Sequence, residues 1–226
     1  MRQVITGAFV SLDGVMQAPG GPQEDPTHGF EHGGWVVPYL DDAFGQAVDE
    51  LFGPPFELLI GRRTYEIFAA HWPYAEHSEY DTIAKRFNST KKYVATRSNM
   101  ELTWKGSIAL HDAASDVARL KRENGPQMIT QGSSDLIQTL LANDLIDEIR
   151  TFTFPIILGD GKKLYGKGAR PAAFALVENR VSTKGVTISR YRRAGNVETG
   201  DFTMDPPTAA EVARRERLAR EESRGT

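Results

Sequence analysis

Three short groups of glycine, hydroxyl and guanidinium side chains each follow an apolar run of the kind that forms a strand. They are Gly61-Arg62-Arg63-Thr64 after FELLI, Thr96-Arg97-Ser98 after KKYVA, and Gly132-Ser133-Ser134 after QMITQ. Hydroxyl and guanidinium groups hydrogen-bond phosphate oxygens, and glycine lets the backbone approach a ligand closely. Where a helix follows, its N-terminus adds free N–H groups and a positive dipole end. Each group therefore suits an anion, although each also fits a capped helix or a polar turn.

The three groups follow strands that helices separate along the chain, which predicts parallel pairing. The carboxyl ends of parallel strands meet at one edge of an open sheet, and ligands of such sheets bind at that edge. Three anion-binding ends on one edge favour a single extended polyphosphate ligand, such as a dinucleotide. The residues by themselves do not select the chemistry.

Several other motifs fall short of the site that each would indicate. No G-x-G-x-x-G follows a strand and opens a helix, and the G-x-x-x-x-G-K at 161–167 lacks the Ser or Thr that binds Mg²⁺ in a phosphate loop. His28 and His32 have metal-ligand spacing, but the glycines around them argue against a helix. Ser133 lacks the G-x-S-x-G frame of a nucleophile elbow. We therefore expect no NTP site, no metal and no serine hydrolase.

Strands and helices are predicted to alternate over residues 1–195. The predicted strands are 4–12, 56–61, 91–98, 107–110, 127–132, 148–158, 174–180 and 185–192, and the predicted helices are 41–52, 64–70, 81–88, 112–124 and 134–142. A long loop rich in Gly and Pro, at 17–34, is typical of a lid or binding loop. The pattern predicts an α/β fold with a mixed, mainly parallel sheet, flanking helices and an antiparallel C-terminal edge.

Residues 196–226 are expected to form a separate charged tail. This segment is rich in Glu, Asp and Arg and poor in large apolar side chains. Pro206-Pro207 end any preceding element, and Thr208 stands three residues before Glu211, the spacing of a helix capping box. A short helix is predicted over 209–222, with Val212 and Leu218 as its small apolar face.

The whole chain has 226 residues, 40% of them hydrophobic and 25% charged, which is enough to bury a core. Its net charge of −3 provides no basic field for nucleic acid or an anionic membrane. No apolar run is long enough for a membrane span, and the N-terminal run is too short for a signal peptide. The absence of Cys excludes disulfides and thiolate chemistry. We expect a cytoplasmic protein with a small-molecule substrate and no nucleic-acid or membrane partner.

The order and spacing of several segments resemble the dihydrofolate reductase fold. They are more similar to the reductases related to the C-terminal domain of the bifunctional riboflavin-pathway deaminase–reductase. The resemblance covers residues 2–193, and its segments are SLDGVM (11–16), GGWVVPYLDD (33–42), LLIGRRTYE (58–66), KYVATRS (92–98), ITQGSSDLIQTLL (129–141) and LIDEIRTFTFPIILGDGKKLY (145–165). It implies a dihydrofolate reductase-like, NADPH-dependent reductase that transfers hydride to a pterin- or aminopyrimidine-like heterocycle or to a carbonyl compound.

The resemblance also implies where the cofactor binds. The family's Gly-Arg-x-Thr motif, which binds NADPH, corresponds to Gly61, Arg62, Arg63 and Thr64. The resemblance further implies that Thr96, Arg97 and Ser98 flank the adenosine 2′-phosphate and that Gly132, Ser133 and Ser134 meet the pyrophosphate. It places Ala8 and the 14–17 segment beside the nicotinamide. Dihydrofolate reductases carry adjacent glycines where this chain has Gly132-Ser133.

The substrate end departs further from the family pattern. Folate reductases place one acid early in the helix after a Trp-x-x-Pro segment, to which Trp35 and Pro38 correspond here. The acids of this chain, Asp41 and Asp42, are shifted along the sequence. Both are candidate proton donors, and the alternative is a charged helix N-terminus that the helix dipole favours. Asp13 is expected to form a turn.

Two other functions stay open at this point. One is an NADP(H)-binding module without turnover. The other is the riboflavin-pathway aminopyrimidine reductase itself, which needs a phosphosugar site that the sequence does not reveal. We expect no deaminase domain to precede it, because the zinc signature of that domain requires Cys and this sequence has none. The two closing strands can pair across a two-fold axis, so a homodimer is expected, and the 17–34 loop is expected to gate the active site.

Overall fold

The computed structural model describes residues 1–78, 80–166 and 169–224. Two compact units make up the chain, a body from Met1 to Asn196 and a tail from Val197 to Thr226. The body contains the sheet and the helices that flank it, whereas the tail contains one helix, α6 (Ala209–Arg224).

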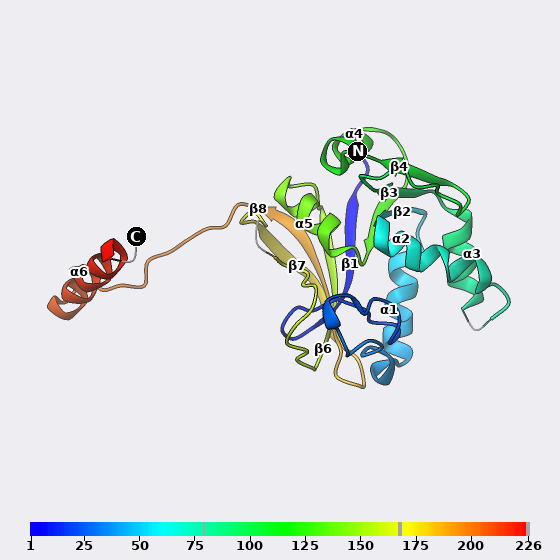
Figure 1. Cartoon of the computed structure of the whole chain (residues 1–226). Helices are drawn as coiled ribbons and strands as arrows, with labels where there is room; N and C mark the ends of the chain where they lie inside the picture. The colour runs from blue at the N-terminus through cyan, green and yellow to red at the C-terminus, as the bar shows by residue number, and fades with distance from the viewer. Residues whose placement is uncertain (79, 167–168, 225–226) are drawn as a thin grey trace. The chain divides into compact units, whose positions relative to one another are not determined.

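Among the described residues, the body is built on one eight-stranded sheet (Figure 1). Its strands are β1 (Val4–Ser11), β2 (Phe56–Gly61), β3 (Lys92–Ala95), β4 (Ser107–Leu110), β5 (Gln127–Gln131), β6 (Glu148–Phe154), β7 (Ala173–Val181) and β8 (Thr187–Gly195). They lie in the order β4-β3-β2-β5-β1-β6-β8-β7. Pairing is parallel from β4 through β6, and β8 runs antiparallel to β6 and β7. The predicted mixed sheet with an antiparallel C-terminal edge is confirmed.

Helices of the body follow the strands, and their N-termini differ in how they are capped. They are α1 (Asp42–Phe52), α2 (Arg62–Ala69), α3 (Asp81–Ser89), α4 (Ala113–Arg122) and α5 (Ser134–Ala142), with short 3₁₀ turns η1 (Thr27–Gly29), η2 (Val37–Tyr39) and η3 (Trp72–Tyr74). Asp41 caps α1 by accepting the N–H of Phe44 at 2.9 Å, and Asp112 caps α4 by accepting that of Ser115 at 3.2 Å. The N-cap residues of α2 and α5 make no side-chain cap.

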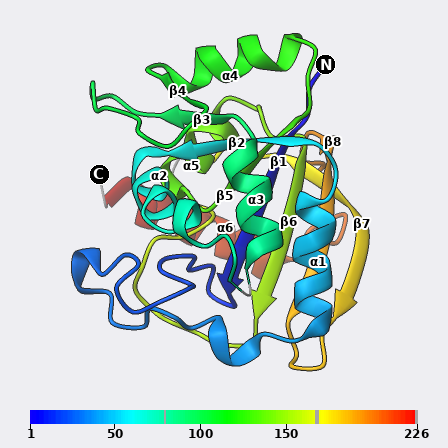
Figure 2. The ribbon, with the colours of Figure 1, turned by 90° about the vertical axis from the view of Figure 1, so that its right-hand side faces the viewer.

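Neighbouring strand residues point to opposite faces of the sheet and enter separate apolar clusters. Leu59 and Met128 pack with α4 and α5, whereas Leu58 and Ile129, one residue away, pack with α1, α2 and α3. All four side chains are fully buried. Figure 2 shows α1, α2 and α3 in front of the sheet and α5 behind it. Burial on both faces explains why the central strands are continuous apolar runs in the sequence.

The long loop that precedes Trp35 packs against the body. The indole of Trp35 is buried and donates its N–H to the carbonyl of Gln17 at 2.7 Å, and Phe30 is buried in the same apolar cluster. Gly161 lies against this loop, and a Cβ there would stand 2.6 Å from Val15 and 3.1 Å from Phe30. Only glycine fits such a contact, and its φ of +136° also disfavours other residues.

Several predicted boundaries were wrong by a few residues, among them those of β6, β3 and α2. β6 ends at Phe154 rather than at residue 158, because Pro155 has no N–H to donate to the ladder. β3 ends at Ala95, and the N–H of Thr96 then bonds Leu110 at 3.0 Å. α2 begins at Arg62 rather than at Thr64, which places both arginines of the Gly-Arg-Arg-Thr group in its first turn.

The tail helix is held by charges of its own. The N–H of Glu211 donates to the Thr208 hydroxyl at 3.2 Å, as the capping-box spacing predicts. The carboxylate of Glu211 pairs with Arg214 at 2.7 Å and with Arg215 at 2.8 Å. Val212 and Leu218 stay exposed, so no apolar face of the helix is buried. In the described part of the chain, no helix has the length and hydropathy to cross a bilayer.

Truncation after Gly195 is expected to leave the melting temperature of the body nearly unchanged. Side chains of residues 197–223 are exposed apart from the half-buried Glu211, so removing them uncovers little apolar surface. Thermal unfolding of the full chain and of the truncated chain, followed by circular dichroism, measures this. A drop of several degrees would show that the tail stabilises the body.

Candidate functional site

A cavity of about 1840 Å³ opens at the carboxyl ends of the parallel strands. It brings together the three groups that the sequence singled out: Gly61, Arg62, Arg63, Thr64, Thr96, Arg97, Ser98, Gly132, Ser133 and Ser134 all line it. The strands that carry them, β2, β3 and β5, are neighbours in the sheet. Parallel pairing therefore gathers residues that are far apart in the sequence, as predicted.

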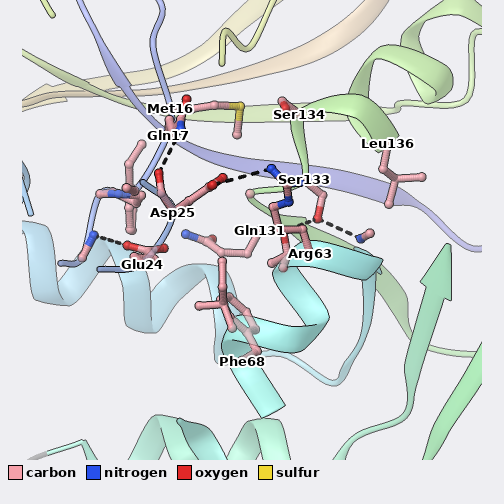
Figure 3. Close-up of a pocket in the computed structure, with 18 of the residues that line it drawn as sticks. Met16, Gln17, Glu24, Asp25, Arg63, Phe68, Gln131, Ser133, Ser134 and Leu136 are labelled. Carbon is pink, nitrogen blue, oxygen red and sulfur yellow. Dashed lines mark hydrogen bonds and ion pairs between the residues drawn. The ribbon is translucent and has the colours of Figure 1, made fainter. Parts of the chain in front are cut away.

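The hydroxyl of Ser133 joins two of these groups. It accepts the backbone N–H of Gly61 at 2.8 Å and donates to the Thr64 hydroxyl at 2.7 Å (Figure 3). The end of β2, the first turn of α2 and the start of α5 are thereby fixed to one another. The sequence allowed Thr64 to cap α2, but it does not. Its hydroxyl instead accepts a hydrogen bond from the Ser133 hydroxyl.

Gly132 and Ser133 stand where dihydrofolate reductases have two adjacent glycines. Both residues are left-handed, with φ of +69° and +68°. Glycine adopts this conformation freely, whereas a residue with a Cβ is disfavoured by about 1–2 kcal/mol. The two hydrogen bonds of the Ser133 hydroxyl offset that cost, so the turn keeps its shape without a second glycine.

Helices α2 and α5 begin at the cavity, and neither N-terminus has a side-chain cap. An α-helix begins with N–H groups that have no partner within the helix, and a bound ligand can serve as their acceptor. In contrast, α1 has its N-cap carboxylate in Asp41. The two uncapped helices begin at Arg62 and Ser134, both of which line the cavity. The positive dipole ends and unpaired N–H groups suit a phosphate there.

The three arginines of the cavity have different partners. Arg62 pairs with Glu66 on its own helix at 2.9 Å, and both side chains are largely exposed. Arg63 donates to the Thr27 hydroxyl at 2.9 Å and lies 3.6 Å from Asp25. Arg97 makes no hydrogen bond or ion pair with the residues that the structure describes. Its guanidinium is therefore available to an anionic ligand.

Thr96 and Ser98 form a turn at the end of β3. The N–H of Ser98 donates to the Thr96 hydroxyl at 3.1 Å, and the two hydroxyl oxygens are 3.0 Å apart. The ring of His111 lies 3.2 Å from the Thr96 carbonyl and also lines the cavity. This end of the cavity thus combines hydroxyl groups, an imidazole and the unpaired Arg97.

A buried carboxylate ties the 17–34 loop to the cavity (Figure 3). Asp25 pairs with the ammonium group of Lys162 and accepts the Thr27 hydroxyl at 2.5 Å. Gln17 reinforces the tie, because its amide donates to the carbonyls of Asp25 and Thr27, both at 2.9 Å, and accepts the N–H of Lys162 at 3.0 Å. Since Arg63 of α2 joins the same network, the loop is held to the helix that carries the Gly-Arg-Arg-Thr group.

Glu24 and Asp25 are adjacent acids of the loop whose pKa values are shifted in opposite directions. Burial by itself would raise the pKa of Asp25, but hydrogen bonds from Lys162 and Thr27 and the charges of Lys162 and Arg63 outweigh burial and lower that pKa. Burial raises the pKa of Glu24, and the charge of Asp25 adds to the effect, against a hydrogen bond from the Gly20 N–H at 2.6 Å. Both side chains line the cavity.

The predicted proton donors lie elsewhere. Asp41 accepts the N–H of Phe44 and, at 2.8 Å, the hydroxyl of Thr183, and these bonds lower its pKa to about 2. Asp42 is exposed in the first turn of α1, and neither acid lines the cavity. Asp41 is thus a helix cap that is ionised at neutral pH, which is the alternative that the sequence left open.

Ala8 and Asp13 also take structural positions. Ala8 is fully buried in the core and does not line the cavity, which is bordered instead by Phe9, Met16 and Gln17. Asp13 accepts the Ser11 hydroxyl at 2.6 Å and the N–H of Gly159 at 2.9 Å, and the former bond above all holds its pKa at about 2. Asp13 therefore shapes a turn, as expected.

Sequence reasoning missed Glu24, Asp25 and Lys162. Two adjacent acids inside a Gly- and Pro-rich loop were the available signal, but Asp25 and Lys162 are separated by 137 positions, and no spacing rule links them. The G-x-x-x-x-G-K run holds Lys162, and its Lys167 lies outside the described residues. Within the described ranges, no cluster of three or more His, Asp or Glu side chains has the geometry of a metal site.

Asp25→Asn is expected to loosen the loop and to lower the free energy of unfolding by about 1–3 kcal/mol, because Lys162 loses its anion. The pKa of Asp25 is lowered in the folded state, so its contribution is present above the ordinary Asp pKa and is lost as pH falls through the lowered pKa. Urea unfolding and amide exchange of the loop between pH 3 and 7 measure this. Stability that matches the wild type at pH 7 would contradict the role of this network.

Two comparisons with known structures bear on the fold. A structure from Shewanella sp. PV-4, whose name links it to riboflavin biosynthesis, matches 85% of this chain and 99% of its own with a TM-score of 0.54 and 21% identity. Dihydrofolate reductase from Enterococcus faecalis, solved with NADP(H), matches 84% of this chain and 96% of its own with a TM-score of 0.54 and 14% identity. The fold is therefore dihydrofolate reductase-like, as predicted.

Two further relatives match over a similar length. A pyrimidine reductase-like protein from Corynebacterium diphtheriae covers 86% of this chain with a TM-score of 0.54 and 14% identity. The uncharacterized protein YyaP of Bacillus subtilis (strain 168) is 24% identical over 195 residues, which are 86% of this chain and 96% of YyaP. The model of the RibD C-terminal domain matches residues 2–188, which include α1 to α5, the residues that line the cavity and the sheet up to the start of β8. The protein belongs to the RibD C-terminal domain family.

Proposed function

We propose that the protein is an NADPH-dependent reductase that adds hydride to a C=N or C=O bond of a small heterocycle of the pyrimidine or pterin type. One observation carries the proposal: three strand ends that carry glycine, hydroxyl and guanidinium groups line a single cavity of about 1840 Å³. Ordinary small-molecule pockets hold roughly 300–1,000 Å³, so this one has room for a dinucleotide and a second molecule. The family and the relatives named for pyrimidine reduction and NADP(H) binding support the same activity.

The residues of the cavity fit the cofactor. The uncapped N-termini of α2 and α5 offer N–H groups to its pyrophosphate, and Arg97, with Thr96 and Ser98 beside it, offers a free cation to its 2′-phosphate. The Oε1 atom of Gln131 is buried without a hydrogen-bond partner among the described residues, and Gln131 lines the cavity at the end of β5. A ligand N–H there would satisfy it. Bound NADPH supplies the hydride.

Reduction also requires a proton, and Glu24 is the acid that we assign to this step. It lines the cavity beside the Met16–Ala18 segment, and its carboxyl oxygen is held by the N–H of Gly20 at 2.6 Å. Its neighbour Asp25 is ionised by its pairing with Lys162, whereas burial raises the pKa of Glu24. Two carboxyls whose environments drive their pKa values apart are typical of an acid beside a fixed charge.

Two alternatives make different predictions for turnover. A reductase of the riboflavin pathway, favoured by the name of the Shewanella structure and by that of a similar deaminase–reductase structure from Thermotoga maritima, would oxidise NADPH in the presence of 5-amino-6-(5-phosphoribosylamino)uracil. A binding module would bind NADPH but would not oxidise it, whichever heterocycle is added. Steady-state oxidation of NADPH, measured with that uracil, with 5,6-diaminouracil and with a dihydropterin, separates these cases. Failure to bind NADPH at all would contradict the proposed function.

Replacing Arg97 by Ala is expected to weaken NADPH binding by about 10- to 100-fold, since a hydrogen bond to a charged group contributes about 1.5–3 kcal/mol and ten-fold in affinity is about 1.4 kcal/mol. Arg62→Ala is expected to do the same. NADH lacks the 2′-phosphate, so its affinity should change far less. Fluorescence titration of wild type and both variants with each cofactor measures the six dissociation constants, and added salt should reduce the preference for NADPH.

The matched control is Arg122→Ala, at an exposed arginine of α4 outside the cavity, which should bind both cofactors as the wild type does. Equal losses for NADH and NADPH in the Arg62 or Arg97 variant would mean that the arginine serves the pyrophosphate or the fold instead.

Glu24→Gln is expected to slow hydride transfer by roughly 100-fold or more at neutral pH, which is the usual loss on removing a general acid. Only the protonated carboxyl donates, so the wild-type rate should fall with rising pH above the raised pKa of Glu24. The variant should lose this pH dependence and keep its affinity for NADPH. Stopped-flow measurement of NADPH oxidation at pH 4 to 9 gives both rates.

Glu31→Gln provides the control, because Glu31 is an exposed acid of the same loop that does not line the cavity. This variant should keep the wild-type rate and pH profile. If Glu24→Gln also keeps them, the proton comes from another group or from water.

A further inference from the structure

The part of the cavity that the cofactor proposal leaves unused is apolar. We call it the apolar arm, and we define it by the lining residues that come from α1, the second half of α2, η3 and α3. Its apolar members are Phe44, Val48, Phe52, Ile67, Phe68, Trp72, Ile83 and Phe87. Figure 3 shows Phe68 below the loop residues and Gln131, so the arm continues from the centre of the cavity.

Phe87 holds the walls of the apolar arm together. Its ring centroid lies 4.9 Å from that of Phe52 on α1, 5.8 Å from that of Phe68 on α2 and 4.9 Å from that of Trp72 on η3. Phe87 and Phe52 are buried, while Phe68 and Trp72 are only half-buried and leave part of their surface to the cavity. The arm is thus a preformed surface of aromatic and aliphatic groups, of the kind that binds apolar parts of ligands.

Charge is distributed unevenly between the apolar arm and the rest of the cavity. The described residues that line the arm include no lysine or arginine, whereas Arg62, Arg63 and Arg97 line the cofactor side. Asp49 of α1 is the titratable group among these described residues, and His71 and Tyr80 line the cavity next to η3 and α3. Asp49 pairs with Arg86 at 3.0 Å, so the guanidinium of Arg86 is already engaged by a carboxylate.

A phosphorylated sugar would therefore be poorly matched to the apolar arm. A phosphate placed against these side chains would lose water and gain no guanidinium or ammonium partner, which is costly. The Asp49 carboxylate would add repulsion. An uncharged aryl or alkyl group would instead cover the exposed parts of Phe68 and Trp72, with a gain of about 25 cal/mol per Å² of apolar surface removed from water.

We infer that the apolar arm holds an uncharged, apolar substituent on the heterocycle, so that the substrate is a flat nitrogen heterocycle bearing an aryl or alkyl group rather than a ribosyl phosphate. This inference rests on the proposed function, because the cofactor must occupy the cationic side. It assigns the ring to the centre of the cavity, near Glu24 and Gln131, and the substituent to the surface between α1 and α3.

Three compounds with one uracil ring test the inference: 5,6-diaminouracil, 5-amino-6-benzylaminouracil and 5-amino-6-(5-phosphoribosylamino)uracil. Calorimetric titration of the full chain saturated with NADP⁺, which does not react, gives their dissociation constants. The benzyl compound is expected to bind about ten-fold or more tightly than the diamino parent. The phosphoribosyl compound is expected to bind no more tightly than the parent.

Two variants test whether the tighter binding of the benzyl compound arises in the apolar arm. Phe68→Ala should remove most of the benzyl advantage, and Val48→Thr, which keeps the side-chain volume and adds a hydroxyl, should reduce it several-fold without threatening the fold. Neither should change the affinity for the diamino parent or for NADP⁺. The matched control is Val177→Thr, at an exposed valine of β7 outside the cavity, which should bind all three compounds as the wild type does.

Tighter binding of the phosphoribosyl compound than of the benzyl compound would overturn the inference, as would a benzyl advantage that survives both Val48→Thr and Phe68→Ala. If NADP⁺ binds and none of the three uracils does, the substrate class is wrong while the cofactor assignment stands. If NADP⁺ itself does not bind, the proposed function fails, and this inference fails with it.

Discussion

Parallel pairing of β3, β2, β5 and β1 is the constraint on which the cavity depends. Because these strands run in one direction, their carboxyl ends meet at one edge, and the residues that follow them are brought together from three distant parts of the chain. The Ser133 hydroxyl then fixes the spacing of two of these ends by bonding Gly61 and Thr64 at once. The turn that presents this hydroxyl is left-handed at a residue with a Cβ, so the position is held by its hydrogen bonds rather than by backbone preference.

The long loop is the second part of the site, and it is fixed by charge rather than by regular structure. Asp25 is buried, so it must keep its cations, and Lys162 and Arg63 come from distant parts of the sequence to meet it. Arg63 belongs to the first turn of α2, the helix that we assign to the cofactor. The position of the loop is therefore linked to the first turn of that helix through the Arg63 guanidinium.

The charges around the cavity divide it into regions with different chemistry. The strand ends contribute guanidinium groups, hydroxyls and free helix N–H groups, whereas α1, η3 and α3 contribute aromatic and aliphatic surface. Glu24 and Asp25 lie at the loop, where one carboxyl is paired and its neighbour is desolvated. Under the proposed function, a hydride donor on the cationic side, an acid at the loop and an apolar surface beyond it would suit the reduction of a ring with an uncharged substituent.

Much of the fold and of the cofactor side of the cavity could be predicted from the sequence, because hydrophobic periodicity and turn-forming residues are local signals. The apolar runs gave the strands, the Gly-Arg-Arg-Thr, Thr-Arg-Ser and Gly-Ser-Ser groups were recognisable by type, and their places after strands predicted a common edge.

The acids could not be assigned in the same way. Asp41 and Asp42 have the right residue type near the expected helix, yet Thr183 and the N–H of Phe44 convert Asp41 into an ionised cap. Glu24 and Asp25 are ordinary loop acids in the sequence, and only the fold brings Lys162 to one and burial to the other. A residue's type and local spacing are written in the sequence, whereas its protonation depends on burial and on partners that the folded chain alone brings within a few ångströms.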